Sequence, residues 1–324
     1  MQPVLRIGTR DSQLAVWQAT LVHGLLKEAG IPSELVYMKS EGDIDTVTPL
    51  YALGVTGVFT KTLDAALLNK RIDIAVHSMK DVPVQLAQGI RQAAVLKRAS
   101  HKDIFVYKNE EELHRIGYID GTWSEKELEK GKFTIATGSV RRIAQWLNRF
   151  PNHTIENLRG NVNTRLAKLD ASNWNGAIFA AAGLERIGLR PERSIDIDWM
   201  LPAPAQGAIM VVCREEDNSS FESCQSFNDE ATALCTKIER DFLKTLMGGC
   251  STPISGLASV NNGNVVFEGN MVSPDGQLKA MINKTAPLAE AAQLGVVAAK
   301  EMLVTGQPIL DAIGKKDLTN NGSV

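Results

Sequence analysis

The stretch VHSMKDVP, residues 76–83, places a cation and a carboxylate directly after a buried apolar run. The preceding residues, Ile72–His77, are typical of a β-strand that ends just before Lys80 and Asp81. In open α/β sheets, ligands bind outside the carboxyl ends of the strands. Asp81 therefore either forms an ion pair with Lys80 or an arginine, or it serves as an acid, a base or a stabiliser of positive charge.

Arginines recur at the expected starts of helices, where a cation opposes the helix dipole by about 0.3–1 kcal/mol. They are Arg10 beside Ser12, Arg141 and Arg142 after Thr137 and Ser139, and Arg159 and Arg165 on either side of Gly160 and Asn161. These arginines either point into solvent or surround an anionic ligand with several carboxylates or phosphates. The sequence has no Gly-x-x-x-x-Gly-Lys-Ser/Thr loop, which disfavours a nucleotide phosphate. Asp81 is the one carboxylate that we place among these cations.

One cysteine, Cys250, lies in a loop of small residues, GGCSTPI. Such a thiol is either a nucleophile or attachment point, or a buried and inert side chain. We interpret Cys213, Cys224 and Cys235 as inert, because no Cys-x-x-Cys pair is present. The five histidines are scattered without zinc-type spacing, so we expect no protein-bound metal.

The composition of the 324 residues restricts the class of protein. A formal net charge of −2 argues against a nucleic-acid coat or a membrane-surface binder. No apolar run approaches the roughly 20 residues of a membrane span, and the first residues do not resemble a signal peptide. We therefore expect a cytoplasmic protein with reduced thiols that binds neither nucleic acid nor membrane.

Strands and helices alternate from the start of the chain. A strand over Val4–Gly8 precedes a helix capped by Ser12, and a strand near Glu34–Lys39 precedes a helix over Lys61–Asn69. This alternation predicts an α/β domain with a mainly parallel sheet. The pattern KFTIATGSVRRIAQW repeats the strand, small residue, threonine, serine and helix of VLRIGTRDSQLAVW, which indicates a second domain of similar architecture.

Two segments are expected to connect these domains, Lys97–Asp103 and Leu201–Ala208. After them the pattern changes to a helix over Glu230–Thr245, short alternating strands and a last helix over Pro287–Leu303. The predicted fold is two similar α/β domains around a cleft, like periplasmic binding proteins, plus a small α+β domain. The predicted bounds are 1–98 with 206–226, then 103–202, then 228–324. The polar segment Gly117–Gly131 reads as a surface insertion.

Seven segments together resemble the porphobilinogen deaminase family, in order and over nearly the whole chain. They are IGTRDSQLAVWQA, IDIAVHSMKDVP, TGSVRRIAQ, LRGNVNTRL, AAGLERIGL, PAPAQGAI and GGCSTPI. The resemblance implies a transferase that joins four porphobilinogen units head to tail with release of ammonia. The product would be linear hydroxymethylbilane, a precursor in heme and other tetrapyrrole biosynthesis. It also implies a dipyrromethane cofactor held by a thioether, and a monomeric protein.

The resemblance implies roles for particular residues of this chain. Cys250 would carry the cofactor, and Asp81 would assist loss of the aminomethyl nitrogen and stabilise the resulting cation. His77 and Ser78 would be structural support. The positions that match cofactor- and substrate-binding residues are Arg10, Ser12, Lys80, Thr137, Ser139, Arg141, Arg142, Arg159, Gly160, Asn161, Arg165, Arg186 and Gln206.

The sequence also departs from the family pattern. Ala52 and Thr56 stand in a loop where the family often has lysines, and Lys39 or Lys61 could compensate. Gly138 replaces a more usual serine. An alternative hypothesis is a non-enzymatic two-lobed binder of small anions, which accounts for the arginines but not for Asp81 or Cys250. A regulatory domain fused to an effector is a third, without a recognisable DNA-reading helix.

Overall fold

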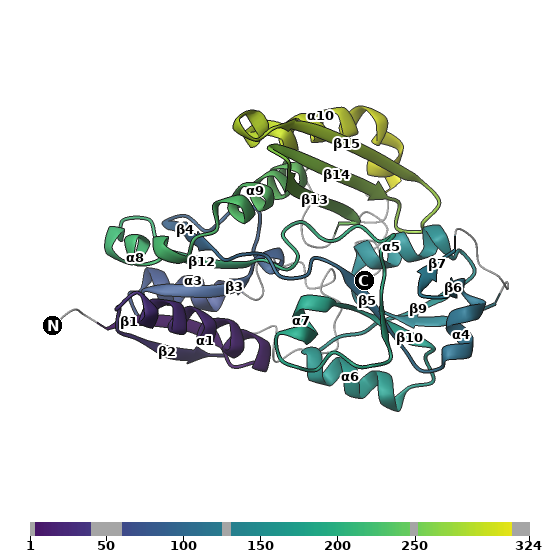
Figure 1. The fold of residues 1–324 in the computed structure, drawn as a ribbon, viewed down its shortest axis with the longest axis horizontal. Coiled ribbons are helices and arrows are strands. Elements are labelled where there is room, and N and C mark those ends of the chain that lie inside the picture. The colour runs from purple at the N-terminus through teal and green to yellow at the C-terminus, as the bar shows by residue number, and fades with distance from the viewer. Residues whose placement is uncertain (1–3, 40–59, 125–130, 247–251, 313–324) are drawn as a thin grey trace, which may run out of the picture.

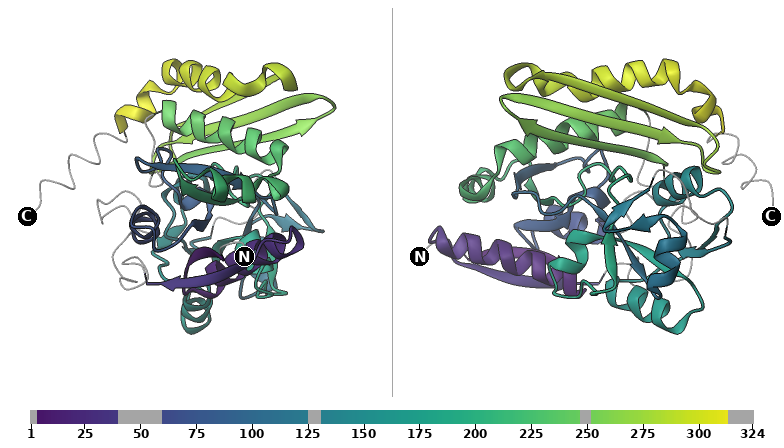
Figure 2. Two further views of the ribbon diagram at one scale, coloured as in Figure 1. Left: turned by 90° about the vertical axis from the view of Figure 1, so that its left-hand side faces the viewer. Right: turned by 45° about the vertical axis from the view of Figure 1, so that its right-hand side comes forward.

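The structure, a computed structural model, describes residues 4–39, 60–124, 131–246 and 252–312. Within these ranges the strands form two five-stranded sheets, one three-stranded sheet and one two-stranded sheet. Figure 1 shows the two larger sheets side by side, with the three-stranded sheet and the helix α10 above them. Both views of Figure 2 show the same layering.

The first sheet has the strand order β2-β1-β3-β12-β4. Its strands are β1 (Leu5–Arg10), β2 (Ser33–Met38), β3 (Ile74–Ser78), β4 (Ile90–Val95) and β12 (Ile209–Arg214). β1 is parallel to β2 and β3, while β12 is antiparallel to β3 and β4. Four of the five strands therefore run in one direction, as the prediction of a mainly parallel sheet requires, and β12 runs in the opposite direction because the chain returns through it.

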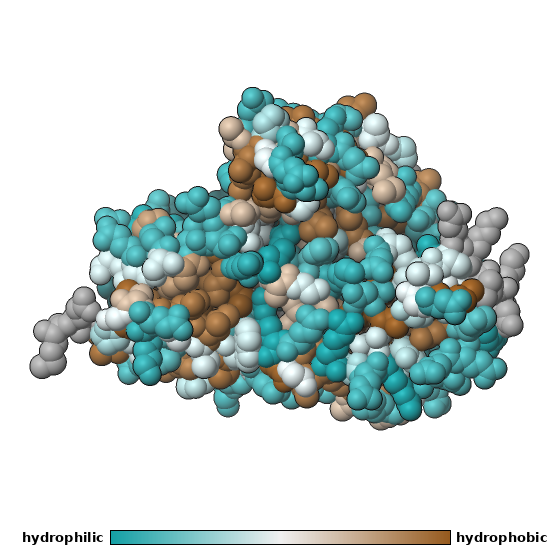
Figure 3. Space-filling view, in the orientation of Figure 1, coloured by the Kyte–Doolittle hydropathy of each residue, from teal (hydrophilic) through white to brown (hydrophobic). Residues whose placement is uncertain are grey.

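The helices α1 (Gln13–Glu28) and α3 (Lys61–Leu68) accompany this first sheet. Helix α1 buries Ala15, Ala19, Val22 and Leu26, whose spacing places them on one face of a helix. That face packs against β1 and β3, and we call this assembly the first unit. Its other face leaves Trp17 and Leu21 partly exposed. Figure 3 shows a hydrophobic area in the region where Figure 1 labels α1.

The second sheet has the order β11-β5-β10-β8-β9. Its strands are β5 (Asp103–Tyr107), β8 (Thr134–Ala136), β9 (Thr154–Glu156), β10 (Gly176–Ala180) and β11 (Ser194–Asp196). From β9 the pairs are two parallel and then two antiparallel, as they are from β2 in the first sheet. The two sheets therefore share one arrangement, which confirms the prediction of two similar α/β units.

Four helices belong to this second unit. They are α4 (Glu110–Arg115), α5 (Val140–Arg149), α6 (Val162–Ala171) and α7 (Ala181–Glu185). Trp146 on α5 and Phe150 directly after this helix are fully buried and pack with Phe105 of β5 in the core. This packing fixes the orientation of α5, and with it the direction of the arginines in its first turn.

The segment predicted as a surface insertion folds in part onto this core. The strands β6 (Tyr118–Ile119) and β7 (Thr122–Trp123) form a short hairpin. The Trp123 indole donates a hydrogen bond to the carbonyl of Asp196 at 2.8 Å, and its ring packs against Trp199. Residues 125–130 of the segment lie outside the described residues. The described part therefore holds the edge of the second sheet rather than only covering surface.

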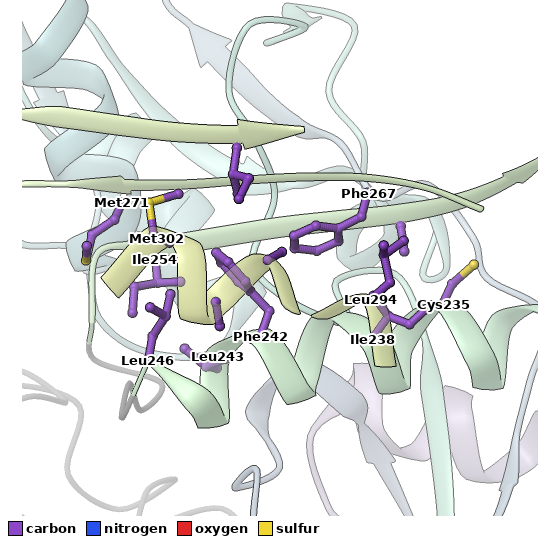
Figure 4. Close-up of a cluster of buried hydrophobic side chains, with 14 of the residues drawn as sticks. Cys235, Ile238, Phe242, Leu243, Leu246, Ile254, Phe267, Met271, Leu294 and Met302 are labelled. Atoms are coloured by element: carbon purple, nitrogen blue, oxygen red, sulfur yellow. The ribbon is translucent and has the colours of Figure 1, made fainter. Parts of the chain in front are cut away.

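The third unit follows the helix α8 (Asn218–Ser223) and the short helix η3 (Gln225–Phe227). It contains α9 (Glu230–Thr245), β13 (Ile254–Asn261), β14 (Asn264–Val272), β15 (Lys279–Pro287), η4 (Leu288–Gln293) and α10 (Leu294–Thr305). The antiparallel sheet packs against α9 and α10 around Phe242, Phe267, Ile238 and Met302, shown in Figure 4. The prediction of a small α+β C-terminal domain is confirmed.

The chain crosses twice between the first two units, and the crossings lie side by side. The amide of Leu96 donates to the carbonyl of Ile209 at 3.0 Å, and the amide of Ala99 donates to the carbonyl of Gly207 at 3.1 Å. Gly207 has a φ of 86°, and a Cβ there would lie 2.6 Å from the carbonyl oxygen of Ser100. Only glycine therefore lets the crossings approach this closely.

Glu239 of α9 joins both crossings to the third unit. Its side chain is 0 % exposed. It accepts hydrogen bonds from the Arg98 guanidinium at 2.8 and 2.7 Å and from the amide of Ala205 at 2.6 Å. It also accepts from the amide of Ala258 in β13 at 2.7 Å. One buried carboxylate thus fixes the three parts of the molecule at a single point.

We expect Glu239→Gln to lower the free energy of unfolding by at least about 3 kcal/mol, because it leaves the Arg98 guanidinium without a buried counter-charge. Urea denaturation measures this. The matched control is Asp241→Asn on the same helix, which removes the more exposed ion pair with Lys237 and should cost less than about 1 kcal/mol. Equal effects of the two variants would contradict the anchoring role of Glu239.

Candidate active site

A cavity of about 600 Å³ lies between the first and second units. The first unit contributes the β1–α1 junction and the end of β3, and the second contributes the starts of α6 and α7. Gly207 and Ala208 of the second crossing also line it. Across it, the side-chain amide of Asn163 on α6 donates to the side-chain oxygen of Gln13 on α1 at 3.0 Å. The cavity is therefore built by both units.

Cations dominate the charged groups that line this cavity. Five arginines, Arg10, Arg142, Arg159, Arg165 and Arg186, and two lysines, Lys39 and Lys80, line it. Among the residues that the structure describes, the lining carboxylates are Asp11 and Asp81. Cations so close together repel one another at the low effective dielectric of a protein. The arrangement is suited to an anionic ligand with several negative groups.

Helix starts from both units add to this positive potential. Ser12 and Ser139 occupy the N-cap positions of α1 and α5, and their hydroxyls make no capping hydrogen bond within the described residues. Asn161 caps α6, with its side-chain oxygen accepting from the amide of Thr164 at 2.9 Å. Gly160 has a φ of 111°, a left-handed backbone conformation that favours glycine, directly before this cap.

Asp81 ends the short helix η2 (Met79–Asp81), which follows β3 directly. Its side chain is exposed and lines the cavity. The Lys80 ammonium donates to the side-chain oxygen of Gln206 at 3.3 Å. The sequence prediction that the strand end directs both groups toward one ligand site agrees with this geometry.

Burial lowers the pKa of Lys80 to about 8. The negative charges of Asp81 and Asp103 raise it, while the positive charges of Arg142 and Arg141 lower it further. Burial likewise lowers the pKa of Arg165 to about 10, with Arg142 acting in the same direction and Asp81 against it. Asp81 thus lies within electrostatic reach of two cations from different units.

The arginine pair of α5 has a partner that sequence reasoning missed. Asp103, the first residue of β5, is fully buried and forms ion pairs with Arg141 at 2.6 Å and Arg142 at 2.7 Å. Burial alone would raise the pKa of Asp103, but the two guanidiniums hold it well below its usual range. The expectation that Asp81 is the one carboxylate among these cations is therefore wrong. A polar residue opening the apolar strand DIFVY was the available signal.

Most of the predicted binding residues line the cavity. They are Arg10, Ser12, Lys80, Arg142, Arg159, Gly160, Asn161, Arg165 and Arg186, together with the predicted catalytic Asp81. Arg141, Gln206, Thr137 and Ser139 are not among the lining residues. Cys250, Ala52 and Thr56 lie outside the described residues.

The predicted binding residues that do not line the cavity contact other parts of the protein. Arg141 donates to the carbonyl of Leu201 at 2.7 Å, in addition to its ion pair with Asp103. Thr137 is buried, and its hydroxyl oxygen accepts from the amide of Ser139 at 3.3 Å. A Cβ at Gly138 would lie 2.8 Å from the carbonyl oxygen of Leu158, which explains glycine there. These contacts fix the segment at the start of α5, next to the residues that line the cavity.

Arg186, just beyond α7, reaches from the second unit to the crossing. It donates to the carbonyl of Gly207 at 2.6 Å, and its guanidinium carbon lies 5.9 Å from the centre of the Trp17 ring on α1. Burial lowers the pKa of Arg186 to about 10. Of the two lysines proposed to compensate for Ala52 and Thr56, Lys39 lines the cavity.

His77 and Ser78 sit below the reactive end of β3. Ser78 accepts a hydrogen bond from the Gln18 amide at 2.9 Å, which ties β3 to α1. Burial, with the Arg10 charge, lowers the pKa of His77 to about 4, so this imidazole is neutral at pH 7. Both residues also line the cavity.

Within the described ranges we find no cluster of three or more His, Cys, Asp or Glu residues arranged to hold a metal ion. Among the same residues, no helix has the length and hydrophobicity needed to cross a lipid bilayer.

Comparison with solved structures finds proteins that share low sequence identity. The VFT2 domain of BvgS from Bordetella pertussis aligns with 13% identity and a TM-score of 0.40, covering 71% of this chain and 91% of that one. An ancestral cationic amino acid solute binding protein aligns with 13% identity and a TM-score of 0.43, covering 69% and 87%.

Comparison with family models gives matches along most of the chain. The model described as "Porphobilinogen deaminase, dipyromethane cofactor binding domain" matches residues 5–222. The model described as "Porphobilinogen deaminase, C-terminal domain" matches residues 233–304. The first match spans both units that build the basic cavity, and the second covers most of the third unit. The chain therefore belongs to the porphobilinogen deaminase family and is a transferase, a hydroxymethylbilane synthase that uses a dipyrromethane cofactor.

Proposed function

We propose that the basic cavity is the active site of this synthase and that Asp81 is its catalytic carboxylate. The observation that carries the proposal is the position of Asp81, exposed at the end of β3 in a cavity lined by seven cationic side chains. Four porphobilinogen units are joined there head to tail, each with release of ammonia. The product is hydroxymethylbilane for tetrapyrrole biosynthesis.

The cavity chemistry fits the substrate and the cofactor. Each pyrrole of either molecule carries carboxylate side chains, and guanidinium groups bind carboxylates through paired hydrogen bonds. Arg10, Arg159 and Arg165 line the cavity near the starts of α1 and α6, where backbone amides add further donors. A volume of about 600 Å³ lies within the usual range for a small-molecule site.

Asp81 acts on the reacting substrate unit. Departure of ammonia from porphobilinogen leaves positive charge on that unit, and a fixed carboxylate stabilises charge as it develops in the transition state. The neighbouring Lys80 binds a substrate carboxylate and keeps it away from Asp81. When bound, the dipyrromethane cofactor supplies the pyrrole carbon to which the first substrate unit is joined.

We propose Cys250 as the attachment point of the cofactor through a thioether. Its loop lies outside the described residues, and the motif GGCSTPI carries this assignment. The flanking strand supports it, since the amide of Gly256 in β13 donates to the carbonyl of Pro202 in the second crossing at 3.2 Å. The same crossing reaches the cavity wall at Gly207 and Ala208.

We assign the remaining predicted binding residues by whether or not they line the cavity. Ser12, Gly160, Asn161, Arg142 and Arg186 contact cofactor or substrate from the wall. The residues behind it, Thr137, Ser139, Arg141 and Gln206, hold the wall in place. Domain bounds of 1–98 with 206–226, 103–202 and 228–324 account for the two crossings.

We further propose a monomer in the cytoplasm. The described residues of one chain supply cavity lining from both units, which is compatible with a monomer. Cys213, Cys224 and Cys235 are free and buried, which fits a reducing compartment.

We expect the intact mass of the protein to exceed that of the bare chain when it is made in a host that synthesises tetrapyrroles. The added mass should be absent in Cys250→Ser, because the thioether cannot form. The control Cys235→Ala removes a buried thiol elsewhere and should keep the added mass. A wild-type mass equal to the sequence mass, or an added mass retained in Cys250→Ser, would contradict the assignment.

Asp81→Asn should keep the added mass but lower kcat by at least about 100-fold, because a neutral amide cannot stabilise the developing cation. Single-turnover kinetics with porphobilinogen measure this. Asp11→Asn removes the other lining carboxylate and should change kcat by less than about tenfold if Asp81 has the specific role. Near-normal turnover by Asp81→Asn would exclude it as the catalytic carboxylate.

The Lys80 ammonium loses its proton as the pH rises through its pKa of about 8. Since the cation binds a substrate carboxylate, kcat/KM for porphobilinogen should fall over this range. Lys80→Gln should have a lower kcat/KM whose alkaline fall is missing. A steady-state profile from pH 6.5 to about 9.5 tests this, and an unchanged alkaline fall in Lys80→Gln would show that another group titrates.

A further inference from the structure

Asp103 occupies the point where the first crossing becomes β5. Its side chain is 0 % exposed. Its backbone carbonyl accepts from the amide of Ile197, and its strand partner is Ala180 of β10. A carboxylate so deeply buried is stable only with partners that replace its hydration. The contacts around it therefore show what the group does.

Four hydrogen bonds reach this carboxylate from two elements. One oxygen accepts from Arg142 Nε at 3.0 Å and Nη2 at 2.7 Å, and from Gln206 Nε2 at 2.9 Å. The other oxygen accepts from Arg141 Nη2 at 2.6 Å. The arginines lie on α5 of the second unit, and Gln206 lies on the second crossing. Asp103 thus joins both crossings to the helix that carries the arginine pair.

Two of these partners connect Asp103 to the cavity. Arg142 lines the cavity and also donates to the carbonyl of Ile178 at 3.0 Å, so its guanidinium is held on two sides. Gln206 donates to Asp103 and accepts from the Lys80 ammonium at 3.3 Å. Lys80 directly precedes Asp81. The buried carboxylate is therefore two hydrogen bonds from a lysine on the opposite unit.

We propose that Asp103 is a positioning residue for the transferase reaction, which fixes Arg142 directly and Lys80 through Gln206 at the wall of the cavity. The proposal rests on the assignment of the cavity as the active site. Asp103 does not line the cavity itself, so it acts through these cations rather than by contact with substrate.

Stability alone does not account for this arrangement. Replacement of a buried ionic group by packed apolar residues is often neutral or stabilising, so burial of Asp103 with two arginines is weak evidence for a role in stability. What the carboxylate supplies is orientation. It uses two donors of Arg142 and directs the amide of Gln206, so that the oxygen of the same amide faces Lys80.

The test is Asp103→Asn, which keeps the size of the side chain and removes its charge. Arg142 and Lys80 bind carboxylates that are present in the substrate and in the transition state alike. Loss of such uniform binding raises KM about tenfold while kcat per cofactor-loaded molecule changes less than about threefold. Intact mass gives a second readout, since we expect the cofactor-loaded fraction of the purified protein to fall at least about twofold.

A double-mutant cycle with Lys80→Gln separates positioning from a general structural effect. Gln206→Met breaks the route to Lys80 and leaves the Asp103–Arg142 ion pair intact, so Gln206→Met combined with Lys80→Gln should have a KM within about threefold of Lys80→Gln alone. If the two effects on KM multiply, the route through Gln206 is overturned. Glu239→Gln is the matched control, because it also neutralises a buried, arginine-paired carboxylate but belongs to the third unit. It should lower stability and leave KM unchanged.

Gln206→Met decides the question if Asp103→Asn does not fold. It leaves the charges of Asp103 and the arginine pair intact and breaks the connection to Lys80. We expect KM to rise about fivefold, and an unchanged KM overturns the proposal. If the cavity is not the active site, Asp81→Asn retains turnover. This result is independent of the Asp103 variants, so it distinguishes failure of the proposed function from failure of the positioning role.

Discussion

Repulsion among like charges is the constraint on which this molecule depends. Seven cationic side chains line one cavity, and the starts of α1 and α6 add their dipoles to the same space. Part of the repulsion is offset within the protein by Asp103, which neutralises one charge of the arginine pair on α5. The remainder favours a ligand rich in carboxylates, and the substrate and cofactor of this family are such molecules.

The fold brings these charges together from opposite sides. Two units with the same strand arrangement each present strand ends and helix starts to the space between them. Neither unit alone has the complete set, because Lys80 and Asp81 come from the first and Arg142, Arg159 and Arg165 from the second. Elongation by four units needs room in the same space, and a site shared between two units connected by only two crossings can provide it.

The sequence predicts features that depend on neighbouring residues. The strand end just before Asp81, the position of Ser12 at the start of α1 and the bounds of α9 follow from local patterns, and the structure has each of them. Asp103 was missed because its partners lie 38 to 103 residues further along the chain. The reversed direction of β12 within a mainly parallel sheet has a related cause, since it depends on where the second crossing returns.

The four hydrogen bonds that Glu239 accepts from three residues have a geometrical consequence. Since this side chain holds Arg98 of the first crossing, Ala205 of the second and Ala258 of β13 together, neither crossing can move relative to the third unit without breaking a hydrogen bond to a buried carboxylate. The third unit therefore restrains both connections between the units that line the cavity.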